Sequence, residues 1–162
     1  MSAEDVFQGK FPIILDKKSG APLWMDLREL KLRYMLPVAS LRKFFEGLVK
    51  GALYGTICEK CGAKYFPPRK ECSNCGASET KWVELSREGK LLSFTVVSVK
   101  PESYQQNSDY VVGLAELKDG FKVLAWVKCD DPMKLKRGMK VKIEIGKRSG
   151  DEIQIYYIVP EG

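Results

Sequence analysis

Apolar residues at the start of the chain follow no regular period. Within residues 1–23 the short apolar stretches are broken by Pro12, Gly20 and Pro22, residue types that interrupt helices and strands. We therefore expect residues 1–23 to form an irregular lead-in to the folded part of the chain.

A helical period begins at Trp24. From Trp24 to about Leu36 the apolar residues recur at steps of three and four, which predicts an amphipathic helix. Pro37 ends that helix and can open a second one, which Gly51 is placed to stop. Residues 24–51 are thus predicted to form a hook of two helices, and the second helix carries an apolar stripe of Leu41, Phe44, Phe45 and Leu48.

After Lys81 the period changes to two, which is the repeat of a β-strand. Asp119 and Gly120 separate two apolar runs and form a strong hairpin signal. Short turns join five such runs, at 91–99, Tyr110–Leu117, Phe121–Lys128, Lys140–Ile145 and Ile153–Val159. The pattern predicts a mostly β protein with N-terminal helices, in which residues 81–162 form a five-stranded antiparallel barrel of the OB type.

Between the hook and the barrel, four of the five cysteines fall in two Cys-x-x-Cys pairs, Cys58 with Cys61 and Cys72 with Cys75. Each pair puts two thiolates on one tight turn, and the glycine after each pair lets the backbone direct its N–H groups toward sulfur. Four thiolates in a tetrahedral array suit Zn²⁺, with iron as the chemical alternative. Because such a site is closed to water, residues 52–80 are predicted to form a structural zinc ribbon.

Length and composition indicate a soluble globular protein. The 162 residues suffice for one ordinary domain or two very small ones. The longest apolar runs, such as residues 11–15, are too short to cross a bilayer. The first residues are acidic and lack the apolar segment of a secretory signal, so we expect a cytoplasmic protein.

Charge and histidine content narrow the function further. The net charge of +6 fits either an anionic partner or a solvated basic surface without one. Histidine is absent, which removes the commonest general base and the His-paired nucleophiles. The fifth cysteine, Cys129, precedes Asp130 and Asp131, whose carboxylates raise the pKa of a thiol, so it is expected to be structural.

Several of these motifs together resemble a family of OB-fold proteins with an N-terminal rubredoxin-like zinc ribbon. The resemblance covers roughly residues 24–159 and is carried by Phe45-Glu46-Gly47-Leu48, Gly51-Ala52-Leu53, the two Cys-x-x-Cys-Gly knuckles, Phe66-Pro67-Pro68-Arg69, the run Tyr110–Leu117, Asp119-Gly120 and Gly138-Met139-Lys140-Val141. It implies a non-catalytic scaffold that associates with acyl-CoA enzymes. In archaea these enzymes are thiolase and hydroxymethylglutaryl-CoA synthase, at the start of the mevalonate route.

The resemblance directs attention to two sets of residues. Phe44, Phe45 and Leu48 would anchor a partner, unless they pack on the ribbon instead. Coenzyme A or an acyl-CoA, if bound directly, would need basic groups for its phosphates. Arg69 beside the ribbon is one candidate, and the others are Lys134, Lys136 and Arg137. Lysines of this kind more often belong simply to a solvated loop.

The alternative function is binding of single-stranded nucleic acid, since OB barrels and zinc ribbons both serve there and the net charge has the right sign. Such binding needs exposed aromatic side chains on which bases can stack, and the sequence shows few obvious ones. Phe94, Tyr110, Phe121 and Trp126 are scattered among apolar alternations, and we expect them to lie in the core. This argument makes nucleic acid the second choice.

Overall fold

The computed structural model describes residues 13–25, 35, 37–100, 104–105, 108–147 and 153–161. It divides the chain into two compact units, Met1–Leu36 and Pro37–Gly162. No helix in the described part is both long enough and apolar enough to cross a membrane.

The first unit contains an antiparallel hairpin. Strand β1 (Ile13–Leu15) pairs with β2 (Pro22–Trp24), with Ile13 opposite Trp24. The turn between them is closed by Asp16, whose carboxylate accepts hydrogen bonds from the backbone and hydroxyl of Ser19. The prediction of an irregular lead-in is therefore wrong over these residues, because a local turn stabilises a pairing that the apolar pattern does not reveal.

The predicted hook is reduced to one helix in the described part of the chain. Trp24, the expected start of the first helix, lies in β2, and the rest of that helix falls on residues outside the described ranges. The second helix begins with a 3₁₀ turn, η1 (Ala39–Leu41), and continues as α2 (Arg42–Val49). Gly51, at φ 75°, ends it as predicted.

The zinc-ribbon segment and the four residues that follow it, 81–84, form a small three-stranded sheet on which α2 packs. The strand order is β4 (Lys64–Tyr65), β3 (Tyr54–Ile57) and β5 (Lys81–Glu84). Gly47 allows close contact between the helix and this sheet, since a Cβ at this position would lie 2.5 Å from a ring carbon of Tyr54.

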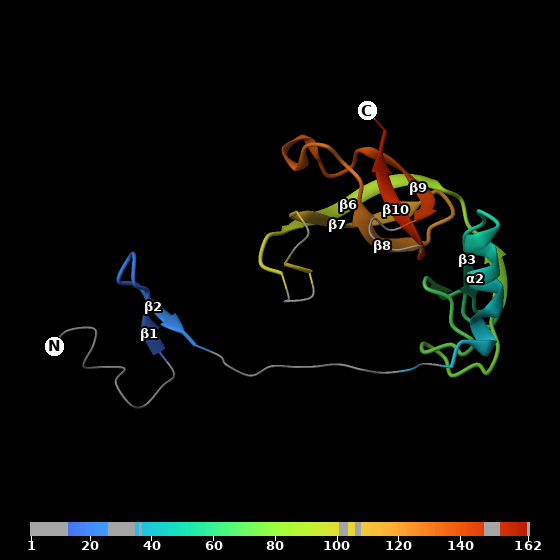
Figure 1. The fold of residues 1–162 in the computed structure, drawn as a ribbon. Helices are drawn as coiled ribbons and strands as arrows, with labels where there is room; N and C mark the ends of the chain where they lie inside the picture. Colours follow the sequence, from blue (N-terminus) through green and yellow to red (C-terminus); the bar gives the residue numbers. More distant parts are fainter. Residues whose placement is uncertain are drawn as a thin grey trace. The chain divides into compact units, whose positions relative to one another are not determined.

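The five predicted strands close into a barrel, which confirms the OB-type architecture (Figure 1). The strands are β6 (Glu88–Val97), β7 (Tyr110–Leu117), β8 (Lys122–Val127), β9 (Lys140–Lys147) and β10 (Gln154–Pro160), in the order β10-β8-β7-β6-β9. The barrel is not wholly antiparallel as predicted. Strand β10 pairs with β8 in parallel, with Tyr157 opposite Trp126, because the connection through η3 (Pro132–Lys134) takes the chain across the barrel before β9.

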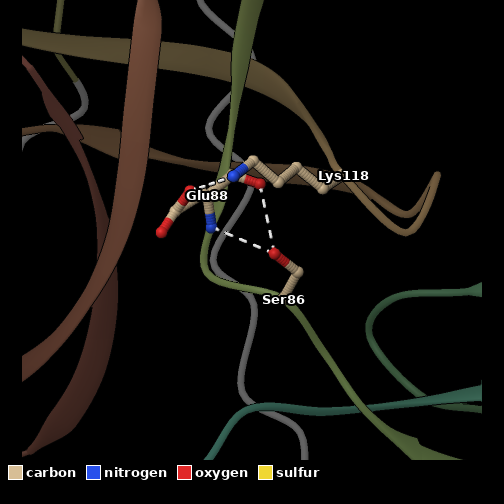
Figure 2. Close-up of polar contacts among 3 residues, drawn as sticks. All are labelled: Ser86, Glu88 and Lys118. Carbon is tan, nitrogen blue, oxygen red and sulfur yellow. Dashed lines mark hydrogen bonds and ion pairs between the residues drawn. The ribbon is translucent and has the colours of Figure 1, made fainter.

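The tight turn between β7 and β8 joins the barrel to the ribbon. The Asp119 carboxylate accepts a hydrogen bond from the backbone N–H of Ser86 at 2.7 Å, and the Asp119 carbonyl accepts one from Lys64 of the ribbon at 2.5 Å. Figure 2 shows the start of β6, where Lys118 forms an ion pair with Glu88 and the Ser86 hydroxyl caps the Glu88 backbone. These contacts fix where the ribbon meets the barrel.

A cluster of aromatic rings from α2, the ribbon and β10 also packs at the junction between ribbon and barrel. Phe44 of α2 packs edge-on against Phe66 of the ribbon and Tyr156 of β10, with ring centroids 5.9 and 6.4 Å away. Phe66 and Tyr156 also contact each other, at 5.1 Å. Helix, ribbon and barrel therefore share one continuous core.

Candidate metal centre and its surroundings

Two knuckles of the same shape hold the paired cysteines. In the first, the backbone N–H of Cys58 donates to Ala63 and that of Gly62 donates to the Cys58 carbonyl, both at 2.8 Å. In the second, Cys72 and Gly76 make the equivalent bonds. Gly62 and Gly76 have φ values of 73° and 70°, so each knuckle needs the left-handed conformation that the sequence predicted.

The four sulfurs converge on one point. The Sγ atoms of Cys58, Cys61, Cys72 and Cys75 all lie within 4.8 Å of one another. The closest pairs, Cys58 with Cys75 and Cys61 with Cys72, are 3.6 Å apart. A zinc ion with tetrahedral Zn–S bonds of about 2.3 Å requires sulfurs roughly 3.8 Å apart, so the arrangement fits such an ion.

Polar neighbours stabilise negative charge on two of the sulfurs. A hydrogen bond from the Tyr65 hydroxyl, 3.0 Å from Sγ, lowers the pKa of Cys72 to about 6. The side-chain amide of Asn74, 3.5 Å from Sγ, lowers the pKa of Cys61. The backbone N–H of Asn74 also donates to the Tyr65 oxygen, which orients that hydroxyl toward sulfur.

The sulfur of Cys75 shows why the site needs a cation. A backbone hydrogen bond from Ala77 lowers the pKa of Cys75, but burial and the neighbouring thiols outweigh it and raise that pKa to about 12. Without a cation the four sulfurs cannot all be ionised at neutral pH, because they lie too close together. A divalent metal ion removes this conflict, and the donor set of four thiolates suits zinc or iron.

A buried hydroxyl positions the second knuckle against the sheet. Thr56 of β3 is almost fully buried, and its side chain donates to the Arg69 carbonyl and accepts from the Arg69 N–H, both at 3.0 Å. The Arg69 side chain itself is exposed, with its guanidinium carbon 5.7 Å from the centroid of the Tyr65 ring.

The predicted anchor residues divide into two groups. Phe44 and Leu48 lie in the core, with exposed fractions of 6% and 5%, whereas Phe45 is 44% exposed. The helix offers a second exposed apolar side chain that sequence reasoning missed, Val49, which is 78% exposed and lies one turn after Phe45. Leu41, one turn before Phe45, is half-buried.

The basic candidates for coenzyme A do not come together. Arg69 and Lys70 line a groove of about 460 Å³, which lies between η1 and the second knuckle and also contains Glu71. Lys134, Lys136 and Arg137 belong to the connection before β9, which lies on the side of the barrel away from the ribbon (Figure 1).

Cys129 has the environment that the sequence predicted. It is half-buried, and burial, followed by the charges of Asp130 and Asp131, raises the pKa of its thiol. A raised pKa leaves little thiolate at neutral pH, so Cys129 is not an activated nucleophile.

The barrel aromatics follow the prediction only in part. Phe121 is buried and Phe94 packs on the core. Tyr110 and Trp126, however, are half-buried and stacked on each other with ring centroids 4.9 Å apart, and the expectation that they lie in the core is wrong.

Comparison with known proteins identifies the family. The family description "ChsH2, rubredoxin-like zinc ribbon domain" matches residues 45–80, and "ChsH2, C-terminal OB-fold domain" matches residues 82–146. A "DUF35 domain-containing scaffold protein" of Methanocaldococcus jannaschii is 31% identical over 129 residues, which cover 78% of this chain and 89% of the relative. The chain belongs to the DUF35 family. This confirms the resemblance seen in the sequence.

Two further matches bear on the function of this chain. The "Benzoylsuccinyl-CoA thiolase subunit BbsA" of Thauera aromatica is 31% identical over 93 residues, covering 53% of this chain and 63% of the relative. Among solved structures, the "Ltp2-ChsH2(DUF35) aldolase" matches 74% of this chain and 92% of that chain, with 25% identity and a TM-score of 0.61.

Proposed function

We propose that this DUF35 protein is a non-catalytic scaffold subunit of an acyl-CoA enzyme of the thiolase type. The observation that carries the proposal is the similarity to a scaffold protein across 89% of that relative's length. The relative named as a thiolase subunit supplies the class of partner. We further propose that hydroxymethylglutaryl-CoA synthase is the second enzyme held, in the cytoplasm and in the mevalonate route.

The chemistry of the chain supports a non-catalytic role. The sequence contains no histidine, so the usual acid–base groups are missing. The cluster of four cysteines offers no open coordination position for substrate or water once a metal is bound. The remaining thiol, Cys129, has a raised pKa. None of these features supplies a general base or an activated nucleophile.

We assign the metal as structural zinc, held by Cys58, Cys61, Cys72 and Cys75. The four thiolates and their spacing support zinc, and the hydrogen bonds from Tyr65 and the Asn74 side chain would hold the ligands in place. In this role the metal joins the two knuckles and so fixes the surface that α2 and the ribbon present.

We propose that this surface docks the partner enzyme. Phe45 and Val49 are exposed apolar side chains on one edge of α2, and a few such anchors usually dominate an interface. Phe44 and Leu48 belong to the same proposal as supports, since their burial holds the helix in place. The adjacent groove with Arg69 and Lys70 would receive the phosphates of coenzyme A or an acyl-CoA at the edge of the interface.

Co-elution tests the proposal. The zinc-loaded chain is mixed with thiolase and hydroxymethylglutaryl-CoA synthase from the same source, and complexes are separated by size-exclusion chromatography. Replacing Phe45 and Val49 with Ala should weaken co-elution, while Met133→Ala, at an apolar site on η3 that is even more exposed, should not. A wild-type chain that binds neither enzyme would refute the scaffold proposal. A double variant that binds normally would refute only the docking surface.

A further inference from the structure

A second surface lies on the outside of the barrel, where three aromatic rings meet. Tyr110 at the start of β7 stacks on Trp126 of β8, with 29° between the ring planes. Tyr104, from the connection between β6 and β7, packs edge-on against Trp126 at 6.1 Å and contacts Tyr110 at 6.2 Å. All three residues are half-buried, so none of them is enclosed in the core. We call this group the aromatic shelf.

Strand alternation shows that the shelf faces outward. Val111 and Val127 pair with each other across β7 and β8, and both are buried inside the barrel. Their neighbours Tyr110 and Trp126 must therefore point to the opposite side. Leu124, two residues before Trp126, lies on the same outer side and is 62% exposed. The outer face of these two strands is thus apolar where water-facing strands are normally polar.

Two residues of the shelf, Tyr110 and Trp126, line a pocket of about 640 Å³. The pocket is also lined by Lys128 after β8 and by Lys147 at the end of β9, both exposed. Of the two carboxylates in its wall, Asp109 is already paired with Lys100 at 2.8 Å, and the other is Asp130. The pocket therefore combines flat π surfaces with cationic groups, and its volume lies within the usual range for ligand sites.

We propose that the aromatic shelf binds single-stranded nucleic acid, with a base stacked on the shelf and the neighbouring phosphates near Lys128 and Lys147. Stacking on aromatic side chains is tolerant of base identity, and lysines that track the backbone supply the attraction to phosphate. The net charge of +6 favours the approach of a polyanion. The second and third strands of an OB barrel, here β7 and β8, and the loop between the first two are where this fold commonly binds oligonucleotides.

Two other occupants fit this surface less well. A peptide that binds by adding a strand needs an open sheet edge, and the barrel is closed. A neutral oligosaccharide could stack on the rings, but it would make no use of the two lysines as charges. Salt dependence therefore separates nucleic acid from sugar in an experiment.

The test measures fluorescence anisotropy of a labelled oligothymidine, and of its oligouridine counterpart, each about 12 nucleotides long, on titration with the full zinc-loaded chain. Trp126→Ala should weaken binding by about ten- to a hundred-fold, the range for loss of one stacked base. Leu124→Ala is the matched control, because it removes an exposed apolar side chain from the same strand face but no ring. Lys128→Gln should reduce the steepness of the salt dependence by about one phosphate contact.

A conservative variant separates binding from folding. Trp126→Phe keeps a ring at the shelf and should retain most of the affinity, while the quenching of tryptophan emission by bound oligonucleotide should disappear. Trp82→Phe should keep both affinity and quenching, since Trp82 lies in β5 of the ribbon sheet and is not part of the shelf.

Three results would overturn the proposal. These are no binding of either oligonucleotide at about 50 mM salt, equal binding by the wild-type chain and Trp126→Ala, and binding of a neutral oligosaccharide or a single mononucleotide as tight as that of the oligonucleotides. The proposal is independent of the scaffold function, so Trp126→Ala should still co-elute with the acyl-CoA enzymes.

Discussion

Replacing Phe44 with Ala is expected to destabilise the whole ribbon–barrel unit. The Phe44 ring is 6% exposed and packs edge-on against Phe45, Phe66 and Tyr156, with centroids between 5.3 and 6.4 Å away. Burial of such a side chain contributes about 1.5–3 kcal/mol, and each edge-on ring pair adds about 0.5–1.5 kcal/mol. The cavity left by truncation brings the expected loss to about 3–5 kcal/mol.

Phe45→Ala is the matched comparison, because it removes the same side chain from the next position of the same helix. Phe45 is 44% exposed and, among the described residues, packs against one ring, that of Phe44, so its loss should cost less than about 1.5 kcal/mol. Urea unfolding followed by circular dichroism gives both free energies, with the metal content of each variant measured alongside.

The two variants together test whether Phe44 is a support or an anchor. If Phe44→Ala cost no more than Phe45→Ala, or Phe45→Ala cost as much as about 3 kcal/mol, the division into a buried support and an exposed anchor would be wrong. A shift in the slope of the urea transition would show instead that the ribbon and barrel had begun to unfold separately.

Three further outcomes follow from the metal centre and the helix. Cys72→Ser should lose the metal and unfold the ribbon, while Cys129→Ser should retain it, as elemental analysis of the purified variants would show. The hydrogen bond from Tyr65 lowers the folded-state pKa of Cys72 from the ordinary value of 9.0 to about 6. The stability that this thiolate contributes is therefore complete above about pH 9, declines as the pH falls between these two values, and is gone below about pH 6. Tyr65→Phe should therefore release metal at a higher pH than the wild type in a chelator titration, and equal release pH values would exclude this role. Gly47→Ala should cost about 1–3 kcal/mol in urea unfolding, because its Cβ would lie 2.5 Å from the Tyr54 ring, and a neutral effect would mean that this ring can move away.

Features that depend on neighbouring residues could be predicted from the sequence. The knuckles are local, since each cysteine pair and its glycine specify a turn over five residues, and both turns are present. Strand β7 has the predicted bounds, Tyr110–Leu117, and Asp119 and Gly120 form the predicted turn. The four cysteines of the candidate metal site could be identified from their spacing in the sequence alone.

Features that depend on distant partners were missed. Strand β7 is apolar on both sides, with Val111 buried and Val112 half-buried, so alternation could not show that Tyr110 points outward. The parallel contact between Tyr157 and Trp126 joins residues far apart in the sequence and has no local signal. The same limit applies to α2, where only the position of the ribbon decides that Phe44 is buried and Phe45 is not.

The junction between ribbon and barrel has a mechanical consequence. It is held from two directions, by the rings of Phe44, Phe66 and Tyr156 and by the turn at Asp119, which bonds to Lys64 and Ser86. Two points of attachment leave no hinge between these parts. A molecule bound to the ribbon would then keep a constant orientation relative to a molecule bound to the barrel. The distance between the two would be set by the ribbon–barrel junction and not by the affinity of either one.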